Sequence, residues 1–473
     1  MQLDVSETGS GRRLASLWRQ PLAHPVCEAM AVAVSTPLLL AVAFWNGFPL
    51  IFYDTGAYLL QGLGHKFLVE RSPVYSLFLD YGGGGSSLWF IAVVQALATA
   101  FVIVETARCV APRMSIGVFL GVVAGLIVLT GLPWYAGQIE PDCFTAITVL
   151  CVYLLTFHVR RLGWPRTLAI LAIGAFAAGT HPSHLLLIAG LVLVASGFKI
   201  LSIIHHNRPA LAQCNIALPT LSALLGLCLI VASNHALTGK IFINRAGSVF
   251  VFASMLQDGL AERLLDDTCP ASHYALCKYR GHLPATAERW LWFETSPFAK
   301  LGHFDGTADE SQRVVMAIVA RYPGAVLLST LRDTAEQLVT FRTGDQIEPQ
   351  EWVIYPALDR FIPRQMHAYM DARQQQGKIR FGVVNAFHVP VAILAQLALI
   401  VLLVLCVRRR RWNAAIFLGF ILVALLGNAF ICGALSNPRD RYQSRLIWLP
   451  FFAVALLGTE RGFALRAQAE SGT

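Results

Sequence analysis

Charged residues are scarce in this chain of 473 residues: Asp, Glu, Lys and Arg make up 14% of it, whereas 56% is hydrophobic. Soluble domains carry about 25% charged residues, so the shortage excludes an ordinary soluble protein. Several apolar runs approach or exceed the roughly 18 to 20 residues that cross a bilayer. The sequence therefore predicts a polytopic helical membrane protein.

Cysteine motifs are also missing. The ten cysteines form no CxxC pair and no zinc-ligand spacing. Most of them lie in or near apolar runs, where a cysteine behaves as a small buried apolar residue. Cys269 and Cys277 differ, because they lie in a long polar stretch. This pair could form a disulfide in an oxidising compartment.

Three further absences narrow the function. The first apolar run is followed by no small-residue cleavage site, which indicates a retained span. The chain shows no internal repeat, and its acids lie at span ends, which weighs against a transporter. Basic and acidic residues balance between Lys240 and Arg380, so the net charge of +9 lies in the membrane part. That placement fits the positive-inside rule and excludes a nucleic-acid partner.

Apolar runs and alternating basic clusters predict the topology. About ten spans are expected, at residues 26–45, 88–107, 115–132, 143–159, 167–179, 185–203, 216–232, 386–407, 414–435 and 446–457. Both termini are expected in the cytoplasm. The fold class is all-α, with a transmembrane module over residues 1–233, an α-rich extracytoplasmic domain over 234–382 inserted before the last three helices, and C-terminal transmembrane helices over 383–473.

The first external loop contains Asp54 and then Glu70-Arg71-Ser72-Pro73-Val74-Tyr75. Ionisable groups at a bilayer boundary are costly and often functional. A carboxylate there can accept a proton from a hydroxyl nucleophile, and an arginine beside it can bind phosphate. The alternative is that Asp54 caps a helix beginning at Thr55.

Two more external loops carry candidates. Glu140 and Asp142 precede the fourth span, where Asp142 could be either a functional acid or a helix cap. His181 and His184 flank a turn after the fifth span. They could contact a ligand or phosphate, or they could be a hydrogen-bonded turn. No HExxH motif accompanies them.

The last external loop reads Arg439-Asp440-Arg441-Tyr442-Gln443-Ser444-Arg445. Three external arginines oppose the positive-inside trend, so an anion is expected to offset them. That anion could be lipid headgroups or a phosphorylated substrate. Arg441 and Arg445 are spaced i, i+4 and would share one helix face.

Together these motifs resemble the GT-C superfamily of integral-membrane glycosyltransferases, in the branch of lipid A aminoarabinose transferases and protein O-mannosyltransferases. The matching features are, in order, Asp54, Glu70 to Tyr75, Pro141-Asp142, Thr180-His181-Pro182 and Arg441-Tyr442. Two positions depart from the pattern: Arg71 replaces the usual lysine and Ser72 replaces a proline. Residues 234–382 match no known feature of the superfamily.

The resemblance implies inverting transfer of a hexose or pentose from a polyprenyl-phosphate donor to an envelope lipid, glycan or protein. It places this reaction at the periplasmic face of a bacterial inner membrane. Asp54 would be the general base and Asp142 would assist it. The donor phosphate would be held by Arg71, His181, Arg441 and Arg445. Substrate contacts are expected from Tyr58, Glu70, Tyr75, Glu140, His184 and Tyr442.

No cofactor is required by this scheme, although a divalent cation, Mg or Mn, could assist. The sequence shows no clear ligand set for such a cation. Two alternatives stay open. One is an envelope polysaccharide polymerase or ligase of related architecture, and the other is a non-catalytic transport or assembly protein of the membrane.

Overall fold

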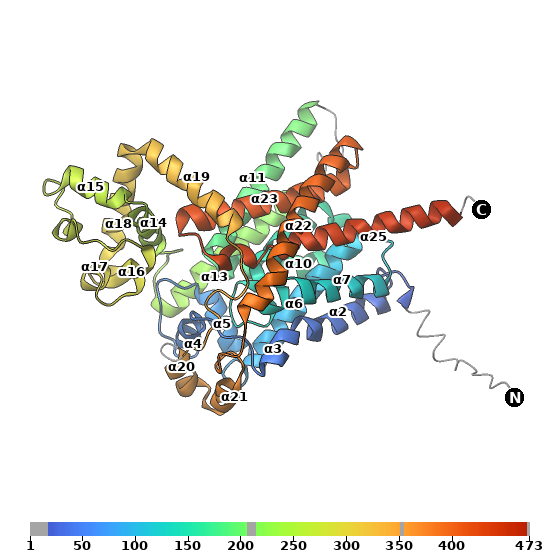
Figure 1. Ribbon diagram of the computed structural model, residues 1–473, viewed down its shortest axis with the longest axis horizontal. Helices are drawn as coiled ribbons and strands as arrows, with labels where there is room; N and C mark the ends of the chain where they lie inside the picture. The colour runs from blue at the N-terminus through green and yellow to red at the C-terminus, as the bar shows by residue number, and fades with distance from the viewer. Residues whose placement is uncertain (1–17, 206–213, 351–353, 471–473) are drawn as a thin grey trace.

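The computed structural model describes residues 18–205, 214–350 and 354–470, and within these ranges every regular element is a helix. Figure 1 shows a bundle of long helices with a separate group of helices, α14 to α18, at one end. The start of α2 and the end of α25 lie at the opposite end. The termini themselves, which were predicted to be cytoplasmic, lie outside the described residues.

The bundle consists of long apolar helices from both halves of the chain. They are α2 (Pro25–Leu39), α3 (Ala41–Asn46), α6 (Leu88–Val110), α7 (Ile116–Leu129), α9 (Cys143–Phe157), α10 (Val159–Thr180), α11 (Pro182–His205), α13 (Ala217–Thr238), α22 (Phe381–Arg408), α23 (Trp412–Leu435) and α25 (Trp448–Glu470). Four shorter helices join them: α4 (Thr55–Gly62), α5 (Pro73–Tyr81), α8 (Leu132–Ala136) and α24 (Asp440–Ser444).

Seven of the described helices, counting the broken helix α2–α3 as one, are long and apolar enough to cross a membrane. The number rises to eight if the bent pair α18 and α19 forms one span. The predicted count of ten is not confirmed. Helices α7 and α9 coincide with the third and fourth predicted spans but have only 14 and 15 residues. The last predicted span lies in α25, which is not among the seven.

The segment between α13 and α22 contains the remaining helices. These are α14 (Gly247–Gln257), α15 (Leu260–Thr268), η1 (Ala275–Tyr279), α16 (Ala287–Trp292), α17 (Pro297–Lys300), α18 (His303–Arg321), α19 (Pro323–Val339), α20 (Ile354–Phe361), η2 (Pro363–Gln365) and α21 (Met366–Asp371). Residues 246–322 share a hydrophobic core of their own, whereas Ile354, Leu358 and Tyr369 pack into the core of the bundle. The boundaries 234 and 382 stay a prediction.

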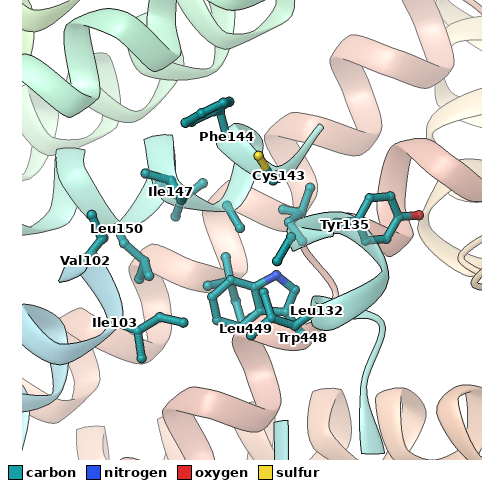
Figure 2. Packing of buried hydrophobic residues seen from close by; sticks show 14 of the residues in the cluster. Val102, Ile103, Leu132, Tyr135, Cys143, Phe144, Ile147, Leu150, Trp448 and Leu449 are labelled. Carbon is teal, nitrogen blue, oxygen red and sulfur yellow. The ribbon is translucent and has the colours of Figure 1, made fainter. Parts of the chain in front are cut away.

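The bundle core lies directly beneath the loop between α8 and α9. Figure 2 shows side chains of α6, α8, α9 and α25 meeting there, with Phe144 and Trp448 among them. Both rings are almost fully buried. Burying aromatic rings of this size contributes most of the packing energy at such a point. The loop above is therefore fixed by helices from both halves of the chain.

Small residues allow α10 and α13 to approach closely. A Cβ at Gly226 of α13 would lie 2.5 Å from Ala178 Cβ and 2.9 Å from Ala175 O of α10. One turn away, a Cβ at Gly174 would lie 2.7 Å from Ser222 Oγ. Small residues four apart on each helix are the usual means of close packing between helices in membranes.

A buried ionic network also ties together three helices of the bundle, at Glu28 of α2, Glu105 and Arg108 of α6, and Arg166 of α10. Glu105 is bound by Arg108 at 2.6 Å and by Arg166 at 3.0 Å, and Arg166 reaches Glu28 at 2.8 Å. Each carboxylate therefore has a guanidinium partner, as buried charges require. The sequence analysis did not identify this network.

The Gly226→Val variant tests the close contact of α10 with α13. The new side chain collides with backbone, so we expect a loss of about 1–3 kcal/mol of stability. Thermal unfolding of the purified protein in detergent measures it. Gly190→Val in α11 is the matched control, because a Cβ at Gly190 meets nothing within 4 Å. Equal melting temperatures for the two variants would contradict this packing.

Candidate functional site

The first and second external loops are joined by backbone hydrogen bonds. Leu50 and Gln138 form an isolated bridge, in which Leu50 N donates to Gly137 O and Ile139 N donates to Leu50 O, both at 2.9 Å. Thr55 Oγ1 also donates to Ile139 O at 2.9 Å. These bonds place the loop after α3 beside the loop after α8, so that the acids of both loops meet.

Asp54 and Asp142 stand at helix starts, but neither carboxylate caps its helix. Asp54 Oδ1 accepts a hydrogen bond from Arg71 Nη2 at 2.5 Å, and its Oδ2 lies 3.4 Å from Arg441 Nη1. Both residues thus occupy the N-cap position that the alternative predicted, but neither side chain makes the capping hydrogen bond. Their carboxylates bind arginines instead.

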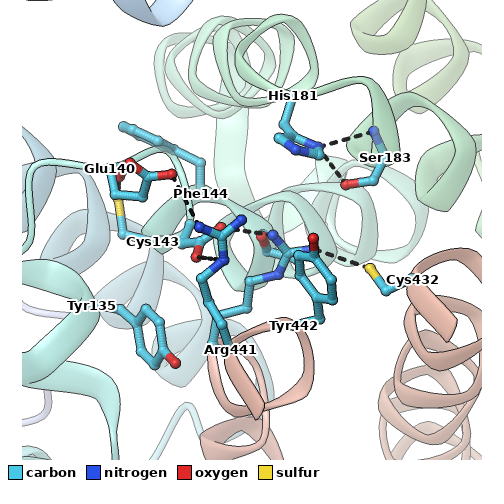
Figure 3. Close-up of polar contacts among 12 residues, drawn as sticks. Tyr135, Glu140, Cys143, Phe144, His181, Ser183, Cys432, Arg441 and Tyr442 are labelled. Carbon is cyan, nitrogen blue, oxygen red and sulfur yellow. Dashed lines mark hydrogen bonds and ion pairs between the residues drawn. The ribbon is translucent and has the colours of Figure 1, made fainter. Parts of the chain in front are cut away.

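Asp142 is bound by two arginines of the last external loop. Arg445 Nη1 lies 2.7 Å from Asp142 Oδ1, and Arg441 Nε lies 3.3 Å from Asp142 Oδ2. Arg441 Nη1 is also 3.7 Å from Glu140 Oε1, a contact drawn in Figure 3. The single guanidinium of Arg441 thus contacts Asp54, Glu140 and Asp142. We call these three acids, with Arg71, Arg441 and Arg445, the charged cluster.

The cluster has a buried side and a more accessible side. The side chains of Asp142 and Arg445 are 2% and 0% exposed. Those of Asp54, Arg71 and Arg441 are 11–13% exposed. The second group is therefore the more exposed side of the cluster, whereas the Asp142–Arg445 pair is enclosed by protein.

Burial and charge act differently on the two acids of the second loop. Burial and then the negative charge of Asp54 raise the pKa of Glu140 well above its ordinary value. Burial also opposes the ionisation of Asp142, but the charges of Arg441 and Arg445 outweigh it and lower its pKa. Protonation is thus favoured at Glu140 and ionisation at Asp142.

Four polar atoms of the cluster lack hydrogen-bond partners among the described residues. They are Arg71 Nε and Glu140 Oε2, and in the enclosed pair Asp142 Oδ2 and Arg445 Nε, all buried. Most buried polar atoms are satisfied, so an unpaired atom calls for an explanation. A bound ligand would provide hydrogen-bond partners for Arg71 Nε and Glu140 Oε2.

The segment before α22 holds the arginine loop in place. Gln337 of α19 donates from Nε2 to Arg439 O at 2.8 Å and accepts from Arg439 N at 3.0 Å. Asp345 Oδ2 accepts from Arg441 N at 3.3 Å. Because both ends of the Gln337 amide are engaged, the backbone of this loop has a defined position at the cluster.

The two histidines differ in their surroundings. His184 uses both ring nitrogens within the protein, at 2.8 Å from Thr145 Oγ1 and 2.7 Å from Ala177 O. His181 Nδ1 contacts Ser183 Oγ at 2.7 Å. In Figure 3, His181 lies across from the Arg441–Glu140 contact. The ring of His184 is therefore held by protein atoms at both nitrogens, and the ligand contacts expected of both histidines stay a prediction.

The predicted tyrosines are placed around the cluster by packing. Tyr58 and Tyr75 are buried and meet edge to face at 5.0 Å. Tyr75 donates to Gln95 Oε1 at 2.5 Å, and Gln95 Nε2 donates to Gln138 O at 2.8 Å. The Tyr442 ring lies 5.2 Å from the Arg441 guanidinium. These rings support the loops.

Glu70 contributes a backbone contact, because its carbonyl accepts from Arg71 Nη1 at 3.4 Å. Two aromatic residues near the arginines were missed in the sequence analysis. The guanidinium of Arg441 lies over the Phe52 ring at 4.2 Å, and that of Arg71 lies 5.8 Å from Trp292. Phe52, two residues before Asp54, could have been suspected, but nothing in the sequence links Trp292 to Arg71.

The structure joins Cys269 and Cys277, the pair selected from the sequence, in a disulfide. Within the described ranges, no group of three or more His, Cys, Asp or Glu residues could hold a metal ion. The carboxylates of the charged cluster are instead separated by guanidinium groups.

Comparison with protein families, curated proteins and solved structures found no match for this chain.

Removing Arg445 tests the enclosed pair. Arg445→Met leaves Asp142 buried with one guanidinium fewer, so we expect a loss of about 3–5 kcal/mol of stability. Thermal unfolding measures it, with Arg439→Met as control, because Arg439 forms a more exposed ion pair with Glu288 that is worth about 1 kcal/mol or less. Adding Asp142→Asn to Arg445→Met should recover part of the loss. Equal effects of the two arginine variants would contradict the account.

Proposed function

We propose that this protein transfers a sugar from a polyprenyl-phosphate donor to a hydroxyl acceptor at the surface of a membrane. The observation that carries the proposal is the accessible side of the charged cluster. There Asp54, a candidate base, is bound directly by Arg71 and Arg441, two candidate phosphate ligands, at one end of a bundle of apolar helices. The motif resemblance to GT-C glycosyltransferases selects the sugar-transfer chemistry.

The charge of the cluster favours an anionic ligand. With Glu140 protonated, as its raised pKa favours, the arginines outnumber the ionised carboxylates of Asp54 and Asp142 by one. A donor phosphodiester carries one negative charge and would restore neutrality. Guanidinium groups bind phosphate oxygens strongly, and Arg71 Nε is still unpaired.

Donor binding would also prepare the base. Arg71 at present holds Asp54 Oδ1 at 2.5 Å, and a phosphate that binds Arg71 competes with that contact. The released carboxylate can then accept the proton of the acceptor hydroxyl. The hydroxyl oxygen forms a bond to the anomeric carbon, and the bond from that carbon to the phosphate oxygen breaks. The electron pair leaves with the polyprenyl phosphate, whose growing charge the arginines stabilise.

The enclosed pair has a positioning role in this scheme. Asp142 contacts both Arg441 and Arg445, so it fixes the direction of the guanidinium that faces Asp54. Preorganised charges of this kind stabilise a transition state without rearranging. Asp142 therefore acts through Arg441.

The disulfide of the segment between α13 and α22 supports a proposal for the compartment. The disulfide between Cys269 and Cys277 supports an oxidising environment for the segment that contacts the cluster, and a periplasm provides one. The bacterial inner membrane, with the site facing the periplasm and both termini in the cytoplasm, is the setting that we propose. The acceptor is an envelope lipid, glycan or protein.

Asp54→Asn tests the base. We expect it to lower the transfer rate by a factor of about 100 or more, because proton transfer is lost. The assay follows release of polyprenyl phosphate by mass spectrometry from a panel of polyprenyl-phosphate sugars, with envelope extracts as acceptor. Asp80→Asn, which alters a carboxylate 4.0 Å from the exposed His65, is the control. Wild-type rates in a folded Asp54→Asn protein would refute the role, and addition of whole repeat units would favour a polymerase or ligase.

Glu140 gives a pH test. Its raised pKa means that the protonated form, and with it the extra positive charge, is lost as the pH rises through that pKa. Affinity for an anion should then fall by about 10-fold or more. Calorimetry with farnesyl methyl phosphate, a diester whose single charge stays constant over this range, measures the affinity. Glu140→Gln should keep high affinity at alkaline pH. A pH profile identical to that of the wild type would contradict the assignment.

A further inference from the structure

Trp292, the last residue of α16, lies beside Arg71. Its ring lies 5.8 Å from the Arg71 guanidinium and 6.3 Å from the Phe304 ring, and it remains 44% exposed. Trp290 of the same helix is by contrast a core residue. It is fully buried, and its ring centroid lies 5.1 Å from that of Phe252. The core of residues 246–322 is therefore built on Trp290, which leaves much of the Trp292 ring free.

Several contacts fix α16 against the site. Glu288 at the start of α16 forms an ion pair with Arg439 at 2.8 Å. The loop before Arg71 is held from the same segment, because Val69 packs against the core of residues 246–322 and Phe67 meets Phe242 edge to face at 5.6 Å. Trp292 thus has a defined position beside the arginine.

The position of Trp292 beside Arg71 indicates which part of the donor the tryptophan would contact. In a polyprenyl-phosphate sugar, one bridging oxygen joins the phosphate to the sugar ring. If Arg71 binds the phosphate, the sugar lies next to that arginine, within reach of an indole ring already in contact with it. The carbon–hydrogen face of a sugar ring is apolar and packs well against an exposed aromatic face.

We propose that Trp292 binds the sugar of the donor and thereby contributes to the choice of sugar. This inference rests on the proposed function, because it takes Arg71 as a ligand of the donor phosphate. It also gives the segment between α13 and α22 a direct part in substrate recognition, since α16 belongs to that segment.

The test separates the sugar from the phosphate with ligands of equal charge. Farnesyl methyl phosphate carries no sugar, and farnesyl phosphate esters of glucose, mannose and galactose carry one each. Calorimetry on the full-length protein in detergent gives both affinities. We expect the wild type to bind at least one glycosyl ester more tightly than the methyl ester, by about 2- to 12-fold for an aromatic contact.

In Trp292→Ala this preference should disappear, while the affinity for the methyl ester stays within about 2-fold of that of the wild type. Trp292→Phe should retain most of the preference, because a flat ring remains. Trp164→Ala, which removes a 72% exposed tryptophan of α10, is the control and should change neither affinity. Melting temperatures verify that each variant is folded.

Three results would overturn the inference. If Trp292→Ala weakens both esters equally, the ring only positions Arg71. If the preference survives in Trp292→Ala, or the wild type has none, Trp292 does not bind the donor sugar. If the wild type binds neither ester, or Arg71→Gln binds them as well as the wild type, the proposed role of Arg71 fails and this inference fails with it.

Discussion

A carboxylate that is buried at the end of an apolar helix bundle needs a positive partner, and Arg445 supplies one to Asp142. The two side chains are 0% and 2% exposed and 2.7 Å apart. Breaking a buried pair of this kind is strongly destabilising, because one charge is left without compensation. The pair joins the start of α9 to the end of α24, just before the last helix. It therefore holds the first half of the chain and its C-terminal part in one arrangement.

The remainder of the charged cluster depends on that pair. Arg441 is positioned by Asp142, and it then contacts Asp54, which Arg71 binds from the other side. The site therefore has two parts. The Asp142–Arg445 ion pair is enclosed by protein, whereas Asp54, with Arg71 and Arg441, is more exposed. An arrangement of this kind combines rigidity with access, which electrostatic catalysis and binding of an anion both need. The segment between α13 and α22 adds Gln337, Asp345 and Trp292 to the same site.

The sequence allowed the helices and the individual charged residues to be predicted, because both leave local patterns. The apolar runs correctly located the bundle helices. Helices α7 and α9 are nevertheless shorter than the spans predicted for them, because the length of a helix depends on where the chain turns. Charge bias placed the acidic and arginine loops on one side. The contacts between them could not be predicted, because Asp142 and Arg445 lie 303 residues apart and nothing local records their pairing. The same holds for Trp292 and Arg71, and for the network of Glu28, Glu105, Arg108 and Arg166.

The central claim is that the accessible side of the charged cluster binds the phosphate of a prenyl donor and releases Asp54. The most direct measurement is an electron cryo-microscopy structure of the full chain in a lipid nanodisc, determined with the diester farnesyl methyl phosphate bound. The account predicts phosphate density against Arg71 and Arg441, with the Asp54–Arg71 contact broken and the Asp142–Arg445 pair intact. Phosphate density elsewhere on the protein, with Asp54 still bound to Arg71, would contradict it.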